Sequence, residues 1–130
     1  MKQLLLGLML LVTATVASAE WTRVDHNDLF IQYVDKATIR RNGNLVKMWD
    51  LMDYKTVRKS AAGKSYLSDK SQAEYDCKEK KTRLLAFTWF DGRMGNGKAV
   101  SFNSNVRAEW IPIGPESMGE ALFEIACGKK

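Results

Sequence analysis

Two cysteines, Cys77 and Cys127, are the residues of this 130-residue chain whose chemistry is easiest to predict. In an exported protein, two cysteines favour a disulfide over a metal site or a catalytic nucleophile. The first residues of the chain indicate export, as described below, so we predict that these two cysteines are bonded. Closing a loop of this size should stabilise the fold by about 4 kcal/mol, because it restricts the unfolded chain.

Other reactive residues give little support to catalysis or to metal binding. His26 is the only histidine, which leaves no zinc site and no histidine-activated nucleophile, and we expect it at the surface near a strand end. Asp50 and Asp53 fall on opposite faces of one predicted strand. The glycine-rich stretch 92–98 resembles a phosphate loop, but Ala99 stands where serine or threonine would hold magnesium. We therefore predict a non-enzymatic protein without cofactor or metal.

The basic residues suggest a binding surface instead. The chain has a net charge of +5 at pH 7, which suits an anionic or acidic partner, and export argues against nucleic acid. Basic side chains gather in a predicted loop and around a predicted turn. The alternative is that they only keep solvated loops soluble. The candidate partner-binding residues are Arg58, Lys59 and Lys64 in the loop and Lys78, Lys80, Lys81 and Arg83 around the turn.

Four tryptophans are many for a chain of this length. Tryptophan is frequent in binding hot spots, but it is also frequent in small sheet cores. Because these residues lie in or beside predicted strands, we favour packing in the core or in a dimer. They are Trp21, Trp49, Trp89 and Trp110.

Residues 1–19 have the three parts of a signal peptide. Lys2 is the positive start, residues 4–12 are apolar but too few to span a bilayer, and residues 17–19 are small. We predict cleavage before Glu20, which leaves one domain over residues 20–130. The product is expected in the periplasm, secreted, or at the cell surface, with no lipid anchor evident and no integral membrane segment after cleavage.

The remaining chain predicts a sheet followed by a helix. Alternation of apolar and polar residues indicates six strands separated by turn-forming segments. The segment 35–44 ends on Asn42-Gly43, which favours a hairpin, while 56–64 and 91–98 are predicted loops. The predicted strands cover residues 20–26, 29–35, 45–54, 65–77, 82–90 and 99–113, the last interrupted by a bulge near 103–105.

A helix is predicted over Ser117–Cys127. Ser117 and Glu120 have the spacing of a capping box, and Gly128 can end the helix. Its apolar residues form a broad arc, which predicts a mostly buried helix. Because it ends on Cys127, it should pack on the strand face that carries Tyr75 and Cys77.

Six strands and one helix make an antiparallel α+β domain. A helix of this length measures about 16 Å, while six strands span about 29 Å, so the helix cannot cover the sheet. The remaining apolar surface must be buried by strong curling of the sheet or by a second subunit. We predict a homodimer.

Several short segments have an order and spacing that together are typical of one family. They are Tyr33-Val34-Asp35, Ile39–Gly43, Asp53-Tyr54-Lys55, Lys64–Ser68, Glu74–Cys77, Met94–Gly97, Trp110-Ile111-Pro112 and Gly119–Leu122, with Trp21, Trp49 and Cys127. Through these segments the chain resembles the surface-adhesin protein E family of Gram-negative bacteria. The resemblance implies a curved antiparallel sheet of about six strands, a C-terminal helix held to its concave face by the disulfide, and a dimer.

The resemblance also suggests a function. Characterised members are adhesins that bind host matrix and plasma glycoproteins such as laminin and vitronectin. We therefore predict a non-enzymatic exported binding protein, with adhesion to such glycoproteins as the leading hypothesis. The alternative is a periplasmic inhibitor of the lysozyme-inhibitor type, or a stress-related protein of unknown ligand. Family members can be lipid-anchored, and this chain lacks a cysteine near the predicted cleavage site.

Overall fold

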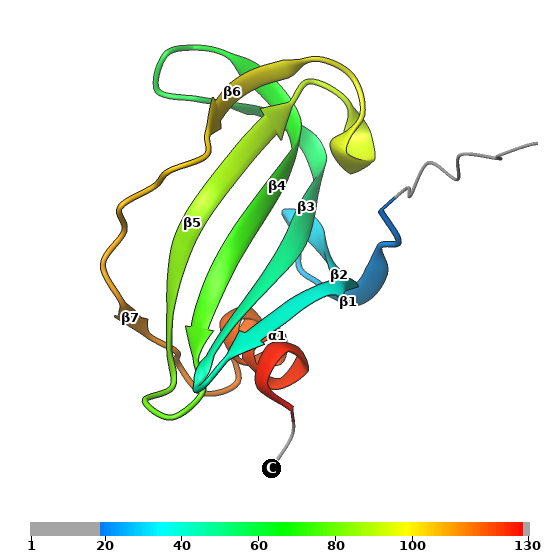
Figure 1. Ribbon diagram of the computed structural model, residues 1–130. Helices are drawn as coiled ribbons and strands as arrows, with labels where there is room; N and C mark the ends of the chain where they lie inside the picture. The colour runs from blue at the N-terminus through cyan, green and yellow to red at the C-terminus, as the bar shows by residue number, and fades with distance from the viewer. Residues whose placement is uncertain (1–18, 129–130) are drawn as a thin grey trace, which may run out of the picture.

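A computed structural model describes residues 19–128, which form one antiparallel sheet and a C-terminal helix (Figure 1). The strands pair in the order in which they occur in the chain. Residues 1–18 of the predicted signal peptide lie outside the described residues. The path of the sheet comprises β1 (Thr22–His26), β2 (Phe30–Asn42), β3 (Leu45–Lys59), β4 (Ser65–Asp76), β5 (Lys81–Phe90) and β6 (Ala99–Asn103).

β2 is longer than the sequence predicted, because the turn-rich segment 35–44 belongs mostly to the strand. The register with β3 shifts between Asp35 and Arg40 and then resumes up to Asn42. Inside this irregularity, the Asp35 carboxylate accepts a hydrogen bond from the backbone of Ala37 at 3.1 Å. The polar residues that indicated a loop therefore lie in a bulge, where Asp35 forms a hydrogen bond with a backbone amide of the bulge. The predicted hairpin is confirmed, with Gly43 at a φ of 62° in the turn.

β3 also extends further than predicted, and the loop expected over 56–64 is wrong in its first half. After an irregularity beyond Asp53, Arg58 pairs with Tyr66 and Lys59 pairs with Ser65. The turn is confined to residues 60–64. Strand pairing continues there because β-pairing depends on the neighbouring strand more than on local hydrophobicity.

The last predicted strand is divided into two separate strands. β6 pairs with the end of β5, while β7 (Ile111–Pro112) pairs with its beginning. Residues 104–110 between them run beside β5, where the Val106 amide donates to the Leu85 carbonyl at 2.9 Å. The interruption is therefore a connecting segment and not the bulge that we predicted.

Helix α1 (Met118–Cys127) begins and ends close to the predicted residues. The Ser117 hydroxyl accepts a hydrogen bond from the Glu120 amide at 3.1 Å, while the Glu120 carboxylate accepts from the Glu116 amide at 3.3 Å. The reciprocal bond thus reaches one residue before the one expected for a capping box. Gly128 forms the C-cap with a φ of 84°. No described helix is long and apolar enough to cross a membrane.

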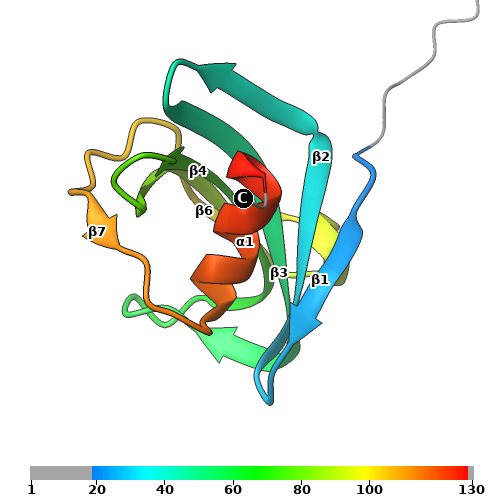
Figure 2. The same cartoon turned by 90° about the horizontal axis from the view of Figure 1, so that it is seen from below.

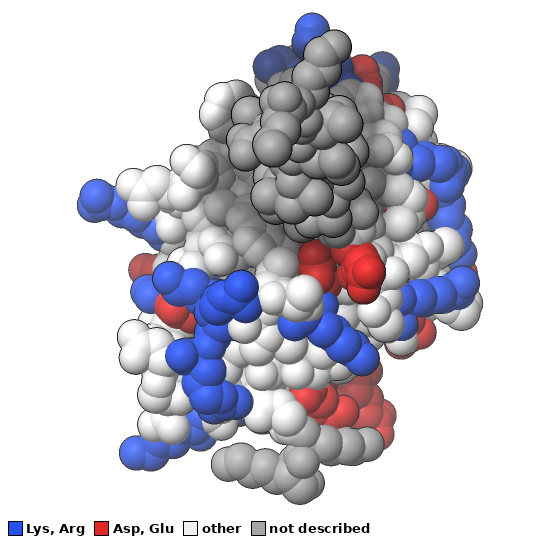
Figure 3. All heavy atoms as spheres, turned by 45° about the vertical axis from the view of Figure 1, so that its right-hand side comes forward, with Lys and Arg blue, Asp and Glu red and all other residues white. Residues whose placement is uncertain are grey.

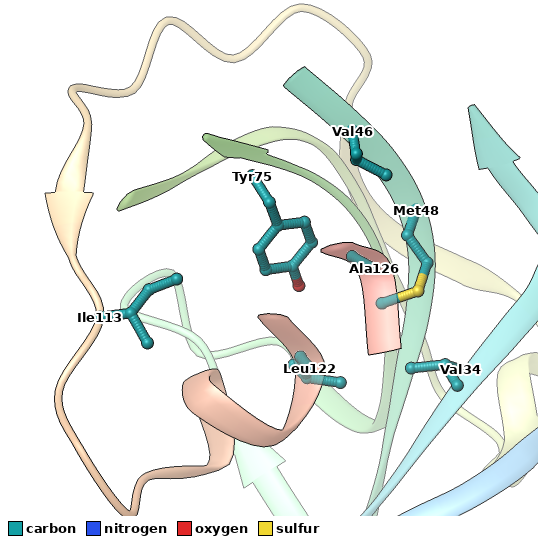
Figure 4. Packing of buried hydrophobic residues seen from close by; sticks show 7 residues of the cluster. All are labelled: Val34, Val46, Met48, Tyr75, Ile113, Leu122 and Ala126. Carbon is teal, nitrogen blue, oxygen red and sulfur yellow. The ribbon is translucent and has the colours of Figure 1, made fainter. Parts of the chain in front are cut away.

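The helix lies inside the curl of the sheet, against one end of its concave face (Figure 2). Only Leu122 and Ala126 of the helix are buried, so the prediction of a mostly buried helix is wrong. The sheet extends well beyond the helix, which leaves most helical residues half-buried. The core between them is shown in Figure 4 and contains Val34, Val46, Met48, Tyr75, Ile113, Leu122 and Ala126.

The disulfide that we predicted joins the helix to the sheet. Cys77 and Cys127 are bonded with an S–S distance of 2.04 Å and a Cα–Cα distance of 5.6 Å. Tyr75 is 2% exposed and packs edge-on against Phe123 of α1, with ring centroids 6.4 Å apart. The strand face that carries Tyr75 therefore faces the helix, as expected.

The opposite, convex face is partly covered by the glycine-rich loop. This loop contains the short 3-10 helix η1 (Arg93–Gly95) and packs over β3 and β4. The Ser68 hydroxyl donates to the Gly92 carbonyl at 2.6 Å and accepts from the Gly95 amide at 2.9 Å. Leu51 beneath the loop is fully buried. Curling and this loop thus bury apolar surface that we had expected a second subunit to bury.

Candidate binding site

The basic residues predicted to bind a partner lie in two groups at opposite ends of β4. Arg58, Lys59 and Lys64 flank the start of this 12-residue strand, and the residues from Lys78 to Arg83 follow its end. A strand of this length spans about 40 Å. Figure 3 shows lysine and arginine side chains in several separate groups with carboxylates between them. The structure therefore does not bring the predicted residues together into one basic surface.

In the first group, two of the three basic side chains make contacts within the chain. The Arg58 guanidinium lies 5.5 Å from the centre of the Tyr54 ring. The Lys64 ammonium donates to the Val100 carbonyl at 3.1 Å. Arg58, Lys59 and Lys64 are all exposed. This group therefore borders the aromatic side chains described below.

In the second group, two of the four basic residues form ion pairs. Lys80 contacts Glu120 at the start of α1 at 2.6 Å. Arg83 donates to the Glu74 carboxylate through Nε at 2.9 Å and Nη2 at 2.6 Å, and its guanidinium stacks 4.4 Å from the centre of the Trp110 ring. Among the four, Lys78 and Lys81 are the exposed side chains for which no ion pair is formed in the described residues.

A row of aromatic side chains crosses the concave face beyond the helix, from β2 to β5. Each neighbouring pair of rings is in contact, with centroids 4.5–5.8 Å apart, and the Tyr66 and Trp89 rings are stacked at 4.5 Å. All five rings are half-buried, so each keeps part of its surface open to solvent. We call this set the aromatic row; it consists of Phe30, Tyr54, Tyr66, Trp89 and Phe87.

The tryptophans do not occupy the core, which was one of the two placements that we favoured; their packing in a dimer stays a prediction. Each of the four is only half-buried. Trp49 lies on the convex face with the Lys70 ammonium 5.0 Å from its ring centre, and Trp110 is stacked on Arg83. Trp89 belongs to the aromatic row. Tryptophan and tyrosine, with arginine, are the residue types most enriched in binding hot spots.

Beside the aromatic row, an open cavity of about 270 Å³ lies between the sheet and the first turn of α1. Its lining is mostly apolar, with Met52, Leu84 and Leu122 among the residues that form it. Two carboxylates also line it, Asp50 from β3 and Asp69 from β4. We call this space the concave cavity.

Asp50 is buried, with 4% of its surface exposed. Burial, and to a smaller extent the charge of Asp69, raise the pKa of this carboxyl from 3.8 to about 7. A hydrogen bond from the Gln32 amide at 3.2 Å acts in the opposite direction. The raised pKa reflects a carboxylate that has lost water without gaining a cation.

Asp69 links the concave cavity to the aromatic row. Burial raises the pKa of its carboxyl, against the lowering effect of hydrogen bonds from Ser71 and Trp89. The Ser71 hydroxyl donates to Asp69 at 2.8 Å. Burial, and then the charge of Asp69, raise the pKa of Tyr54 to about 12. Asp69 therefore acts electrostatically on Asp50 on one side and on an aromatic ring on the other.

Sequence reasoning separated Asp50 from Asp53, and this separation is confirmed. Asp53 lies on the convex face, where its carboxylate accepts from the Met94 amide at 2.9 Å and lies 3.7 Å from Arg93. The pairing of Asp50 with Asp69 was missed. It depends on the register of β3 with β4, which places Asp50 opposite Ser71 and Met52 opposite Asp69. Alternation within β4 could have put Asp69, Ser71 and Tyr75 on one face.

His26 lies at the end of β1 and is exposed, as predicted. Its Nδ1 is 3.0 Å from the Arg23 guanidinium. Within residues 19–128, no group of three or more histidine, cysteine or carboxylate side chains is arranged to hold a metal ion.

The sequence also matches a family model, that of surface-adhesin protein E, over residues 21–128. The chain belongs to the surface-adhesin protein E family. Membership shows an adhesin-like binding protein and implies a binding function over an enzymatic one. Among curated proteins, no sequence matches this chain.

Solved structures of Haemophilus influenzae protein E have the same fold. One, from a non-typeable strain, is 14% identical and superimposes with a TM-score of 0.64, covering 87% of this chain and 78% of that one. A second is 13% identical with a TM-score of 0.65, covering 85% of this chain and 86% of the other. At this identity, the likeness establishes the antiparallel sheet with its C-terminal helix.

Proposed function

We propose that this member of the surface-adhesin protein E family is a non-enzymatic exported protein that binds a glycoprotein partner through its concave face. The observation that supports this proposal best is the aromatic row, five half-exposed rings in continuous contact across four strands. Rigid aromatic side chains bury large areas at little cost in conformational entropy. The strands hold these rings in place before a partner arrives.

The basic residues at the start of β4 extend this surface. Arg58 lies over Tyr54, so the first basic group adjoins the aromatic row. Exposed Lys59 and Lys64 would attract an acidic or sialylated glycoprotein over distances of about 10 Å at moderate ionic strength. The second group, near Lys78 and Lys81, lies at the other end of the sheet and would contact a different part of a large partner.

Export supports the same function. Residues 1–19 are proposed to be a removed signal peptide, which delivers residues 20–130 to the periplasm or to the cell surface. Protease treatment of intact cells distinguishes the two locations. Cleavage on intact cells places the protein at the surface, whereas protection until the outer membrane is opened contradicts an adhesin.

We also propose that the protein forms a homodimer. Within residues 19–128, β1 forms one edge of the sheet and β6, together with the short β7, forms the other, and each of these strands pairs on one side only. An unpaired strand edge can add a strand from a second copy. Light scattering of residues 20–130 at tens of micromolar should give twice the mass of one chain, and a single-chain mass would contradict the dimer.

Binding to immobilised laminin and vitronectin tests the function. We expect Tyr66→Ala to weaken binding of the purified protein at least tenfold, because it removes the ring that stacks on Trp89. Tyr66→Phe keeps the ring and should bind within about twofold of the unmodified protein. Phe102→Ala is the matched control, since Phe102 is 74% exposed and lies outside the aromatic row.

Two results would contradict this proposal. One is the absence of binding to either glycoprotein by the unmodified protein. The other is equal binding by folded Tyr66→Ala and Phe102→Ala, which would place the contact surface elsewhere.

A further inference from the structure

The concave cavity contains two carboxylates for which the described residues supply no cation. The ion pairs formed within residues 19–128 include neither Asp50 nor Asp69. Arg83 also lines the cavity, but its guanidinium is bonded to Glu74 and stacked on Trp110. Burying a carboxylate without a partner is unfavourable, so such a group is a place where a positive ligand gains binding energy.

The polar groups of Asp50 also have unused hydrogen-bonding capacity. Gln32 is the one donor to its carboxylate among the described residues, and the bond reaches Oδ1 only. Oδ2 accepts no hydrogen bond from the described residues and is not fully enclosed, and Asp50 lines the cavity. A charged carboxylate can accept about four hydrogen bonds. Asp50 therefore presents an unused acceptor to the cavity.

Tyr75 gives a second, independent indication. Tyr75 is 2% exposed and lines the same cavity. Its hydroxyl forms no hydrogen bond within the described residues. Figure 4 shows the ring reaching from β4 toward α1, with the hydroxyl end near Leu122. The hydroxyl is not among the fully enclosed side-chain atoms that lack a partner, so the little surface that Tyr75 keeps opens into the cavity. The cavity thus contains a hydroxyl without a hydrogen bond from the described residues, beside a carboxylate without a cation.

The size and the walls of the cavity limit what it can accept. Its volume of about 270 Å³ lies below the range of about 300–1,000 Å³ that is usual for whole small-molecule ligands. Met52, Leu84 and Leu122 supply apolar walls suited to a methylene chain. A long basic side chain combines an apolar stem with a charged end.

We propose that the concave cavity binds one lysine or arginine side chain of the partner protein. The charged end lies between Asp50 and Asp69, and the stem lies along Met52 and Leu84. Residues beside that basic side chain then contact Tyr66 and Trp89, whose rings also attract cations. This inference rests on the proposed function, because it takes the concave face as the surface that meets the partner.

Charge complementarity favours this occupant over a neutral sugar. A sugar ring would stack on the aromatic row and accept or donate hydrogen bonds, but it would leave both carboxylates without a counter-charge. A basic side chain supplies the charge that the site lacks. Sugar binding is therefore the competing outcome in the experiment below.

Short capped peptides provide the probe. Isotope-labelled protein of residues 20–130 is titrated with acetyl-Ala-Leu-Lys-Leu-Ala-amide and followed by NMR through the Met52 methyl group and the Trp89 indole. The matched peptide has norleucine in place of lysine, and a neutral N-acetylglucosamine disaccharide is titrated in parallel. We expect the lysine peptide to bind at least tenfold more tightly than either, with shifts at both reporter groups.

Variants of the two acids locate the site. Asp50→Asn and Asp69→Asn should each weaken the lysine peptide at least tenfold, because each keeps its shape and loses its charge. Glu79→Gln removes one negative charge from an exposed turn and should leave affinity unchanged. Amide spectra of each variant establish that it is folded before affinity is compared.

The outcomes separate the two proposals. Equal affinity for the lysine and norleucine peptides, or tighter binding of the disaccharide, overturns the basic-side-chain site even if laminin or vitronectin still binds. Lysine-peptide binding that depends on Asp50 and Asp69, with no glycoprotein binding, supports the site and contradicts the proposed glycoprotein partner.

Discussion

Asp50 shows how a single residue on a small sheet can be held in an unfavourable environment. Its neighbours along β3 are Trp49, which is half-buried on the convex face, and the fully buried Leu51. Alternation therefore turns Asp50 toward the concave side, where Met48 belongs to the core. Gln32 supplies a hydrogen bond but no charge. A carboxyl retained there lowers stability, which is expected of residues that serve binding.

The pKa of Asp50 predicts how stability depends on pH. The pKa of Asp50 is about 7 in the folded protein and 3.8 in the unfolded chain, where the carboxyl is not buried. Between these two pH values, the folded state therefore binds more protons than the unfolded state. Asp50 therefore makes the protein less stable as pH rises from about 4 to about 7, by at most about 1.4 kcal/mol per pH unit.

Chemical denaturation of the unmodified protein and of Asp50→Asn across this pH range tests the prediction. The difference in unfolding free energy between the two proteins should shift in favour of Asp50→Asn as pH rises. Parallel curves would show that Asp50 is not protonated preferentially in the folded state.

At the scale of elements, the loop of residues 91–98 has a structural role that its glycine-rich sequence does not indicate: it packs over β3 and β4. The Asp91 carboxylate accepts from the Lys98 amide at 2.7 Å, which closes the loop. The side chains of Ser68 and Asp53 then hold η1 against the convex face by accepting hydrogen bonds from its backbone amides. The stretch that resembled a phosphate loop is therefore a cover for β3 and β4.

Two glycines of similar backbone conformation test the importance of this loop closure. Gly97 has a φ of 84°, and a Cβ there would come within 2.2 Å of Asp91 Oδ1. Gly43 has a φ of 62°, and a Cβ there would meet nothing within 4 Å. Gly43→Ala should cost about 1–2 kcal/mol through backbone strain alone. Gly97→Ala should cost at least about 1 kcal/mol more, because Asp91 must move and lose its bond to Lys98.

Thermal or urea unfolding of the two variants measures this difference directly. Gly43→Ala serves as the control for backbone strain, since it lies in the β2–β3 turn and has open space around it. Equal destabilisation by the two substitutions would mean that the Asp91 bond contributes nothing to the fold.

The elements differ in how well the sequence predicts them, for physical reasons. Ser117, Gly128 and the apolar arc of α1 are local signals, and the helix was predicted to within one residue. The extension of β2 beyond Asp35 and of β3 beyond Tyr54 depends on the partner strand, which local polarity does not reveal. The same holds for the candidate site, because Asp50 and Asp69 come together only through the register of two strands. The aromatic residues can be identified in the sequence, but their alignment into one row depends on strand pairing and could not be predicted from it.

At the scale of the molecule, the disulfide and the core lie at one end of the concave face, with the concave cavity beside the first turn of α1 and the aromatic row further along. The disulfide, α1 and the core residues Val46 and Tyr75 lie where β3 and β4 meet the helix. The aromatic row lies beyond the reach of α1 on the same concave face. The sheet beyond the helix depends on curling and on the 91–98 loop, so stability is expected to fall with distance from the disulfide.

Removing the disulfide is the corresponding test. The bond closes a loop with a sequence separation of 50 residues, and its loss should lower the unfolding free energy by about 4 kcal/mol on the loop-entropy model. We expect Cys77→Ala with Cys127→Ala to denature at lower urea concentration than the unmodified protein. A reductant should shift the unmodified protein to a similar midpoint and leave the double variant unchanged.

Hydrogen exchange of the double variant should show the first loss of protection in α1, because Cys127 is its last residue and only Leu122 and Ala126 of the helix are buried. Uniform loss across sheet and helix would instead show that the two unfold as one unit and that the bond stabilises the whole domain.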